Sequence, residues 1–461
     1  MSDPRREPHR VKHRARPISK QPFATVVGAF ALAVGLWPTA ATAAPQIRTV
    51  PFPPGHYGFM ETKVVANGNV AYVTTQNGDA HHAHLWSIAI ASGQLIDPDG
   101  LALPLAIGSN PTLFAGGRLA LAGYWSTPFD TQGLGVVNVS NPANLALLDV
   151  IPVPAAGQSL YYQSCPVLAA ADGKTAFMVG QNFMTNGQPR LFSFDVEALT
   201  ALDPDGLGLP GYSDASILAG DRLVMPDVDH AALIVVDVFS PHDLWPAASI
   251  ALPAGSTLNS SNNPVVSEDG TMAFLGTKQR RVYSFDLDAL ALADFDGIPY
   301  GNDGLQYPGL QVQGLTLTRR GDQLGAVAGN GLSFAGAGDP ADLGPVADAD
   351  FGYPQPGMQG LATAGFGSSG RAATVPTIYT TFGTPDVRLF VFDTHDGGSL
   401  GSLPICHGRQ QANRVTVTRD DTVAVVCAST DGTDLYLVYG LLPLFADAFE
   451  TGGMARWDGG V

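Results

Sequence analysis

Basic residues are scarce in this chain of 461 residues, which has 24 Lys and Arg against 41 Asp and Glu. An excess of carboxylates repels phosphate backbones and anionic lipids, and this argues against nucleic acids and membrane surfaces as partners. The same excess is compatible with cations, with cationic partners, or with solubility alone. Charge therefore narrows the class of partner without identifying one.

The chain also lacks the short signatures of several enzyme classes. It contains no Gly-x-Ser-x-Gly, because residues 367–370 lack that spacing. A phosphate loop, a dinucleotide fingerprint and a haem-attachment Cys-x-x-Cys-His are absent as well. A binding function is therefore favoured, and whether the protein is an enzyme stays open. A metal-dependent hydrolase or lactonase, with ligands scattered singly along the chain, is one alternative, and a structural scaffold at the cell surface is another.

Cysteine is rare, with three residues in all: Cys165, Cys406 and Cys427. An exported chain can keep a disulfide. Cys406 comes just before the connector into the last unit and Cys427 ends the second strand of that unit, so both are expected near the same rim. A bridge between them is one prediction, and buried free thiols are the alternative. Cys165 is left over in either case.

The chain has no segment longer than about two turns in which apolar residues recur with the period of a helix, and this argues against a helical solenoid. Instead the chain contains eight short apolar blocks, most of them rich in β-branched and aromatic residues, as is typical of buried strands. They span residues 85–90, 134–139, 191–196, 233–238, 282–287, 331–336, 389–394 and 435–440.

A turn signal precedes each block, because Gly, Asn and Asp tolerate the positive φ of a tight hairpin. The signals are Asn67-Gly68, Gly116-Gly117, Asp172-Gly173, Gly220-Asp221, Asp269-Gly270, Gly321-Asp322, Ser369-Gly370 and Asp420-Asp421. They recur at intervals of 48 to 56 residues. A period near fifty with several short strands in each unit predicts the blades of a β-propeller.

The predicted fold is therefore all-β, a single β-propeller in which eight four-stranded blades are favoured over seven. The last unit stops about one strand short, near Gly440. Residues 46–53 precede the first unit and are expected to supply that strand, which would close the ring and protect its sheet edges.

Several blocks resemble the LVIVD and YVTN repeats of exported bacterial β-propellers. The likeness rests on LIVVD at residues 233–237, FDVEAL at 194–199, FDLDAL at 285–290, NVSNPANL at 138–145 and AYVTT at 71–75. The aspartate that follows the strand is present in four units, as Asp195, Asp237, Asp286 and Asp393. The resemblance implies a repeat-built propeller and implies little about activity, because such folds host many functions.

Residues 1–43 have the layout of an export signal peptide. A basic region is followed by the apolar run 23–37, and Ala41-Thr42-Ala43 fits a small-x-small cleavage site. The run is short for a membrane span, so cleavage is favoured over an uncleaved anchor. The mature chain would carry a formal charge of −22. The expected location is periplasmic, at the outer surface, or secreted, with the propeller in residues 44–440.

Residues 441–461 form a separate tail. FADAFETG at residues 445–452, followed by Trp457, resembles a short C-terminal motif of exported proteobacterial proteins, although Ala448 stands where glycine is usual. The resemblance implies a sorting or processing role and a Gram-negative source. An ordinary frayed end is the alternative.

Strand order in a propeller decides which loops share a face. First-to-second turns and third-to-fourth loops form one rim, called here the turn rim. Second-to-third loops and the connections between blades form the other, the connector rim. Polar and aromatic connector residues suit a protein, peptide or glycan ligand, or satisfy backbone groups instead. They are His56, Tyr57, Asn110, Tyr162, Gln163, Asp214, Asn263, Gln313, Gln359 and Asn413.

Two stretches have metal-binding side chains. His81, His82 and His84 lie in one second-to-third loop, and a zinc or copper site there would need further ligands such as His56 or His230. Asp-x-Asp patterns, best at Asp203 and Asp205, alternate carboxylates as calcium loops do, and are expected in turns on the turn rim. No cofactor is assured. The ligand and the oligomeric state are not indicated by the sequence.

Overall fold

The computed structural model describes eighteen stretches of the chain, all within one compact unit that covers residues 43–461. These stretches are residues 45–57, 64–77, 82–107, 111–124, 132–153, 167–180, 189–211, 216–258, 263–299, 312–318, 321–328, 331–350, 358–360, 364–370, 372–381, 384–407, 411–429 and 432–442. Among them no helix is both long and apolar enough to cross a bilayer.

Blades 1 to 4 follow one another along the chain, and each is an antiparallel sheet. Blade 1 contains β2 (His56–Tyr57), β3 (Val65–Asn67), β4 (Val70–Asn77), β5 (Ala83–Ala89), β6 (Gln94–Leu95) and β7 (Leu101–Ala102). Blade 2 contains β8 (Ala106–Ile107), β9 (Thr112–Phe114), the short 3-10 turn η1 (Ala115–Gly117), β10 (Arg118–Tyr124), β11 (Gln132–Asn138) and β12 (Ala146–Pro152). Blade 3 contains β13 (Leu168–Ala169), β14 (Thr175–Gly180), β15 (Arg190–Asp195), β16 (Thr200–Ala201) and β17 (Leu207–Gly208). Blade 4 contains β18 (Ile217–Ala219), β19 (Arg222–Asp227), β20 (Ala232–Asp237) and β21 (Trp245–Ala251).

Blades 5 to 8 continue the same pattern. Blade 5 contains β22 (Val265–Val266), β23 (Met272–Gly276), β24 (Arg281–Asp286), β25 (Ala291–Leu292) and β26 (Ile298–Pro299). Blade 6 contains β27 (Val312–Leu317), β28 (Gln323–Ala328), β29 (Gly331–Gly336) and β30 (Gly344–Asp350). Blade 7 contains β31 (Met358–Gly360), β32 (Gly365–Phe366), β33 (Ala372–Thr381), β34 (Thr384–Asp393) and β35 (Ser399–Ile405). Blade 8 contains β36 (Gln411–Val417), β37 (Val423–Ser429), β38 (Gly432–Tyr439) and β1 (Gln46–Pro51).

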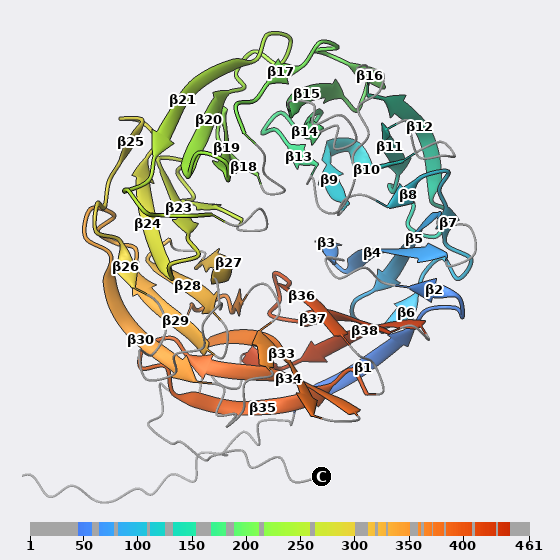
Figure 1. Ribbon diagram of the computed structural model, residues 1–461. Coiled ribbons are helices and arrows are strands. Elements are labelled where there is room, and N and C mark those ends of the chain that lie inside the picture. Colours follow the sequence, from blue (N-terminus) through green and yellow to red (C-terminus); the bar gives the residue numbers. More distant parts are fainter. Residues whose placement is uncertain are drawn as a thin grey trace, which may run out of the picture. The chain divides into compact units, whose positions relative to one another are not determined.

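The eight sheets form a ring, with the first strand of each blade toward the centre and the last at the periphery (Figure 1). This arrangement confirms that the fold is all-β and has eight blades, and it excludes the alternative of seven blades. The eight apolar blocks are the third strands, and the eight turn signals join first to second strands.

Third strands read as continuous apolar runs because both of their faces are covered. In β20, Leu233 and Val235 pack in a cluster with blade 5, whereas Ile234 and Val236 pack in a cluster with blade 3. Successive side chains of a strand point to opposite faces, so a strand between two other blades needs apolar residues at every position.

The predicted ring closure is confirmed. Strand β1 pairs antiparallel with β38, from Gln46 opposite Tyr439 to Pro51 opposite Asp434, and becomes the outermost strand of blade 8. A ring closed by strands from both ends of the fold leaves β38 without an open edge.

Side chains at the closure also join blade 8 to blade 1. Arg48 on β1 donates a hydrogen bond from Nη1 to the Ala91 carbonyl at 3.0 Å, and its guanidinium lies 5.5 Å from the ring centroid of Tyr439. The Tyr439 hydroxyl donates to the Ile90 carbonyl. The third-to-fourth loop of blade 1 is therefore attached to the last strand of the ring.

Much of the acidity of the turn rim belongs to the turns themselves. Asp195 and Asp286 each accept backbone N–H groups from the residues two and three positions later, and Asp237 and Asp393 each accept one from two positions later. This is the hydrogen bonding of an Asx turn. The four aspartates that carry the repeat resemblance thus close the third-to-fourth loops.

First-to-second turns use the same chemistry. Asp269 accepts hydrogen bonds from the Ser267 hydroxyl and from the N–H and hydroxyl of Thr271, and these bonds hold the pKa of the Asp269 carboxyl below its usual value. For Asp172, burial opposes the shift, but bonds from Thr175 and Lys174 outweigh it and lower that pKa as well. Ionised carboxylates are the better acceptors for these turns.

The structure corrects the place predicted for the Asp-x-Asp-Gly motifs, which are not rim turns. Residues 97–100, 203–206 and 294–297 each interrupt the outermost strand of a blade, between β6 and β7, β16 and β17, and β25 and β26. Residues 348–350 lie inside the uninterrupted strand β30. Asp and Gly indicate a break in a strand, but they do not tell whether the chain returns to the same partner strand.

The loop in blade 3 shows how such an interruption is held. Asp203 Oδ1 accepts the N–H of Gly206 at 3.0 Å, and Gly206 has a φ of 62°. A Cβ at Gly206 would lie 2.6 Å from the ring of Phe192, so glycine is required for space as well as for conformation. Arg190 on the third strand donates from Nη1 to the Gly206 carbonyl at 3.0 Å.

Serine hydroxyls connect blades in pairs. Ser87, Ser193 and Ser284, on the third strands of blades 1, 3 and 5, donate to the carbonyls of Pro142, Pro241 and Pro340, in the third-to-fourth loops of blades 2, 4 and 6. Interrupted outer strands occur in the first blade of each pair, and proline loops occur in the second. The repeating unit of these six blades is therefore a double blade.

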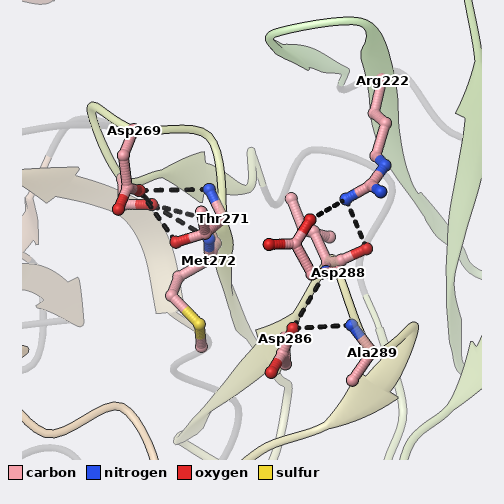
Figure 2. Close-up of polar contacts among 9 residues, drawn as sticks. Arg222, Asp269, Thr271, Met272, Asp286, Asp288 and Ala289 are labelled. Carbon is pink, nitrogen blue, oxygen red and sulfur yellow. Dashed lines mark hydrogen bonds and ion pairs between the residues drawn. The ribbon is translucent and has the colours of Figure 1, made fainter.

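One polar contact between two pairs lies on the turn rim. Figure 2 shows Arg222 of blade 4 reaching the third-to-fourth loop of blade 5, where it donates to the Leu287 carbonyl and lies 2.9 Å from Asp288. Asp286 in the same loop accepts the N–H groups of Asp288 and Ala289. A turn closed by its own aspartate thus presents a carbonyl and a carboxylate to the neighbouring blade.

Cys406 and Cys427 form a disulfide, with Cα atoms 5.3 Å apart. Cys406 follows β35, the last strand of blade 7, and Cys427 lies in β37 of blade 8. The bond therefore ties two blades together next to the ring closure.

Candidate functional site

The connector rim carries the long connections of the ring. The connection from β1 to β3 includes β2, and the connection from β21 to β22 is described at residues 252–258 and 263–264. Several turns on the opposite rim are closed by their own aspartates, as at Asp195 and Asp286. Long loops on a rigid scaffold are where binding residues concentrate in proteins.

Some predicted site residues lie on strands instead of in connectors. His56 and Tyr57 form β2, Gln313 is in β27, Gln359 is in β31 and Asn413 is in β36. All of these strands are at the inner side of their blades. The prediction that they are connector residues is corrected, because the inner strands begin earlier than the apolar pattern indicates.

The other predicted residues are placed as follows. Asn263 comes two residues before β22. His82 is exposed and directly precedes β5, which contains His84. Outside the described residues lie Asn110, Tyr162, Gln163, Asp214 and His81.

A buried chain of hydrogen bonds surrounds His56. The Trp86 indole Nε1–H donates to the Thr75 hydroxyl at 2.8 Å, and Thr75 Oγ1 lies 3.3 Å from His56 Nδ1. Thr75 and Trp86 are almost fully buried and His56 is buried. The Thr75 oxygen accepts from Trp86, and the same hydroxyl can donate its hydrogen to Nδ1 of a neutral His56 ring.

Aromatic contacts enclose the same histidine. The ring of His84 stacks on Trp86 with centroids 4.5 Å apart, and His56 meets both rings edge to face, at 4.7 Å from His84 and 5.1 Å from Trp86. Phe52, which directly follows β1, lies 5.6 Å from Trp86. These side chains thus line the junction where the ring-closing strand enters blade 1.

Burial lowers the pKa of His56, and the neighbouring His84 ring lowers it further. The folded protein therefore binds a proton at His56 less readily than the unfolded chain does. His56 contributes stability that is present above the ordinary histidine pKa of about 6.5 and is lost as the pH falls below it.

We expect the wild-type melting temperature to fall more steeply between pH 7.5 and pH 5 than that of a His56→Asn variant. Asparagine keeps an acceptor for Thr75 and cannot titrate. One histidine accounts for at most about 1.4 kcal/mol for each pH unit. The exposed His242 serves as control, because His242→Asn should leave the slope unchanged. Equal slopes for wild type and His56→Asn would contradict this assignment.

In the predicted transition-metal stretch, His84 has a backbone carbonyl as its partner. His84 Nε2 lies 2.9 Å from the Asp99 carbonyl, and since a carbonyl only accepts, Nε2 carries the proton. His84 thus contacts the outer-strand loop of blade 1 in the way that Arg190 contacts the outer-strand loop of blade 3. In the described part of the chain no three His, Cys, Asp or Glu residues gather as a metal site would require.

The calcium prediction placed Asp203 and Asp205 around one ion. Asp203 Oδ1 accepts the N–H of Gly206, and the carbonyl of Asp205 accepts from Arg190 Nη1 at 2.5 Å. Calcium binding by this pair stays a prediction. A cationic guanidinium on this loop opposes a second cation at the same carbonyls. The loop is held by groups of the chain itself.

One arrangement on the connector rim was missed from the sequence. In the second-to-third loop of blade 4, the His230 Nδ1 lies 2.9 Å from Asp227 Oδ2; the Asp227 side chain is 1% exposed and that of His230 is 63% exposed. A Cβ at Gly211 would lie 1.9 Å from Asp227 Oδ1, so glycine lets the preceding connector pass over the carboxylate. The Asp-x-x-His spacing was the available signal.

This pair fixes an imidazole at the surface. Because Asp227 accepts the hydrogen on Nδ1, the neutral His230 ring presents an unprotonated Nε2. Such a nitrogen accepts hydrogen bonds from hydroxyl and amide groups, which are the groups that glycans and peptides offer.

The geometry defines the class of the molecule as an eight-bladed β-propeller. Solved structures agree: the computationally designed Ika8 protein matches with a TM-score of 0.54 at 13% identity, over 84% of this chain and 98% of its own. The β-propeller domain of Myceliophteria thermophila Cps50 (Swd1) matches with a TM-score of 0.50 at 10% identity, over 73% of this chain and 97% of its own. Such low identities show the fold alone.

Comparisons of the sequence itself give no closer assignment. No protein-family model matches the chain, and no curated protein matches it. The LVIVD and YVTN likeness therefore stays a resemblance.

Proposed function

We propose that this protein is an exported β-propeller that binds a protein, peptide or glycan through its connector rim. The observation that carries the proposal is the difference between the two rims. Described turn-rim loops, such as those after Asp195 and Asp286, use their carboxylates to close themselves, whereas the described connector-rim loop of blade 4 presents the exposed imidazole of His230 on a buried carboxylate. Side chains that loops present on a rigid ring suit recognition.

Two described side chains favour a polar ligand there. The His230 imidazole is oriented by a buried carboxylate and mostly exposed, and Tyr57 lies half-buried on an inner strand beside His56. Tyrosine offers a flat apolar ring and a hydroxyl at little entropic cost, and is common in binding surfaces.

Export is supported by the order of features in residues 1–43, a basic region, an apolar run and a small-x-small site. The proposed location is the periplasm, the outer surface or the medium.

The test begins with the labelled mature protein on two arrays, one of neutral glycans and one of short peptides. A reproducible ligand is then titrated against His230→Ala and Tyr57→Ala. Either variant should weaken binding by about tenfold, the loss typical of one central contact. Lys174→Ala, on the turn rim, is the control and should bind normally. Loss of binding in the control alone, or no ligand on either array, would contradict the proposal.

A further inference from the structure

Blades 4 and 5 expose three large aromatic side chains. Phe239 is 77% exposed, Trp245 is 62% exposed and Phe295 is 73% exposed. The other large exposed apolar residues that the described stretches contain are aliphatic and about 40% exposed. The three aromatic residues are called here the aromatic wall.

The double-blade repeat shows that the fold does not require Phe239. The third strands of blades 2, 4 and 6 end at equivalent residues, Asn138, Asp237 and Gly336, and a third-to-fourth loop with a proline follows each. Two positions after these residues blade 2 has Ser140, blade 6 has Gly338 and blade 4 has Phe239. Small residues therefore suffice at this position.

The same comparison applies to Trp245 and Phe295. Trp245 pairs with the last residue of its third strand, as do its equivalents Ala146 and Gly344. Phe295 directly follows the aspartate that closes its outer-strand loop, and the equivalents in blades 1 and 3 are Pro98 and Pro204. Each aromatic residue replaces a smaller one and contributes little to the core.

The aromatic residues belong to neighbouring surfaces. Asp237 pairs with Trp245, and its carboxylate accepts the N–H of Phe239 at 2.9 Å, so both aromatic residues lie at one end of β21. Phe295 follows β25, and β25 contacts β21 at the periphery of the ring (Figure 1).

The loops and outer strands around the aromatic wall are rich in carboxylates, and the guanidiniums that contact them, those of Arg190, Arg222 and Arg281, come from second and third strands. The third-to-fourth loops and outer strands of blades 3, 4 and 5, residues 196–208, 238–251 and 287–299, contain seven Asp and Glu and no Lys or Arg. Two of the seven, Asp203 and Asp294, close their own loops. The exposed ones are Glu197, Asp205, Asp243, Asp288 and Asp296, of which Asp288 forms an ion pair with Arg222.

We propose that the aromatic wall is a docking surface for a basic protein segment, one with arginine or lysine next to apolar residues. Aromatic faces attract guanidinium and ammonium groups, and exposed Trp and Phe gain from burial by apolar side chains. The carboxylates attract a cationic partner and repel acidic ones, including other acidic proteins and nucleic acids. This surface is separate from the connector rim, so either proposal can fail alone.

The test uses three synthetic twelve-residue peptides of equal spacing, with alternating Arg and Leu, Arg and Ser, or Glu and Leu. Titration of the mature protein should show binding of the Arg/Leu peptide that weakens with salt, weaker binding of Arg/Ser, and none of Glu/Leu. The triple variant Phe239→Ser, Trp245→Ala, Phe295→Pro should bind Arg/Leu at least tenfold more weakly. Each substitution is the residue of an equivalent blade, so the melting temperature should not change.

Leu148→Ser is the matched control, because Leu148 is 41% exposed on the outer strand of blade 2, and it should bind as the wild type does. Equal binding by the triple variant, or Glu/Leu binding as well as Arg/Leu, would overturn the proposal. Dimerisation that the triple variant abolishes, without peptide binding, would assign the wall to a second copy of the chain. Binding of a neutral oligosaccharide that the triple variant abolishes, again without peptide binding, would assign it to a glycan.

Discussion

Replacing Val50 with aspartate is expected to destabilise the whole propeller. Val50 is 2% exposed on β1 and packs in one cluster with Trp86 of blade 1 and Leu435 of blade 8. A carboxylate there would be buried without a partner, at a cost of about 3 kcal/mol or more. Urea unfolding of the mature protein should show this loss, or the variant should not accumulate in folded form.

The matched control lies on the same strand. Ile47 is 38% exposed, so Ile47→Asp keeps its charge in contact with water and should cost less than about 1 kcal/mol. Both variants put one aspartate into β1, and they differ in the face on which it lies. Equal losses of stability in the two variants, or no loss for Val50→Asp, would show that the Val50 face of β1 is not packed against blade 1.

Trp86→Ala should produce the second large loss, about 3 to 5 kcal/mol, typical of a deleted core indole. Trp86 is 1% exposed, stacks with His84 and donates its Nε1–H to Thr75. The cavity would open at the ring closure, so both blade 1 and the end of β1 would lose support. The measurement is again the free energy of unfolding.

Trp86→Phe separates packing from hydrogen bonding. Phenylalanine keeps an aromatic ring against His84 and removes the donor to Thr75, and one lost hydrogen bond costs about 1 kcal/mol. The loss should therefore be clearly smaller than for alanine. If the two variants lost equal stability, the indole ring would not be a packing element of the junction.

The ring could be predicted from the sequence because its two strongest signals are local. Third strands such as β20 are covered on both faces, so they appear as unbroken apolar runs. First-to-second turns need a positive φ, as at Gly173 and Gly270, so they appear as Gly or Asp pairs. A period near fifty follows directly from these two features.

The double-blade repeat was not predicted, because its contacts join residues far apart in the chain. Ser193 and Pro241 are 48 residues apart, and Ser284 and Pro340 are 56 apart. Neither residue type marks a strand or a turn by itself. The outer-strand loops were misplaced for a similar reason, since Arg190 holds the loop at Asp205 from a strand 15 residues earlier.

The candidate sites depend on contacts and exposure that no sequence pattern carries. Histidine and aspartate were recognised as metal-binding types, but His84 lies against the carbonyl of Asp99, 15 residues later, and Asp203 closes its own loop by accepting the N–H of Gly206. The Asp227–His230 pair and the exposed Trp245 depend on burial and on comparison between blades. Neither property can be read from a single stretch of sequence.

Hydrogen exchange of β1, followed by mass spectrometry on the mature protein, tests the central claim that this strand closes an eight-bladed ring. The Phe52 N–H donates to the Thr433 carbonyl, and alternation along an antiparallel pair directs the N–H groups of Arg48 and Val50 toward β38 as well. These amides should exchange as slowly as those of β38, while the intervening ones exchange fast. Rapid exchange throughout β1 would contradict the closed ring.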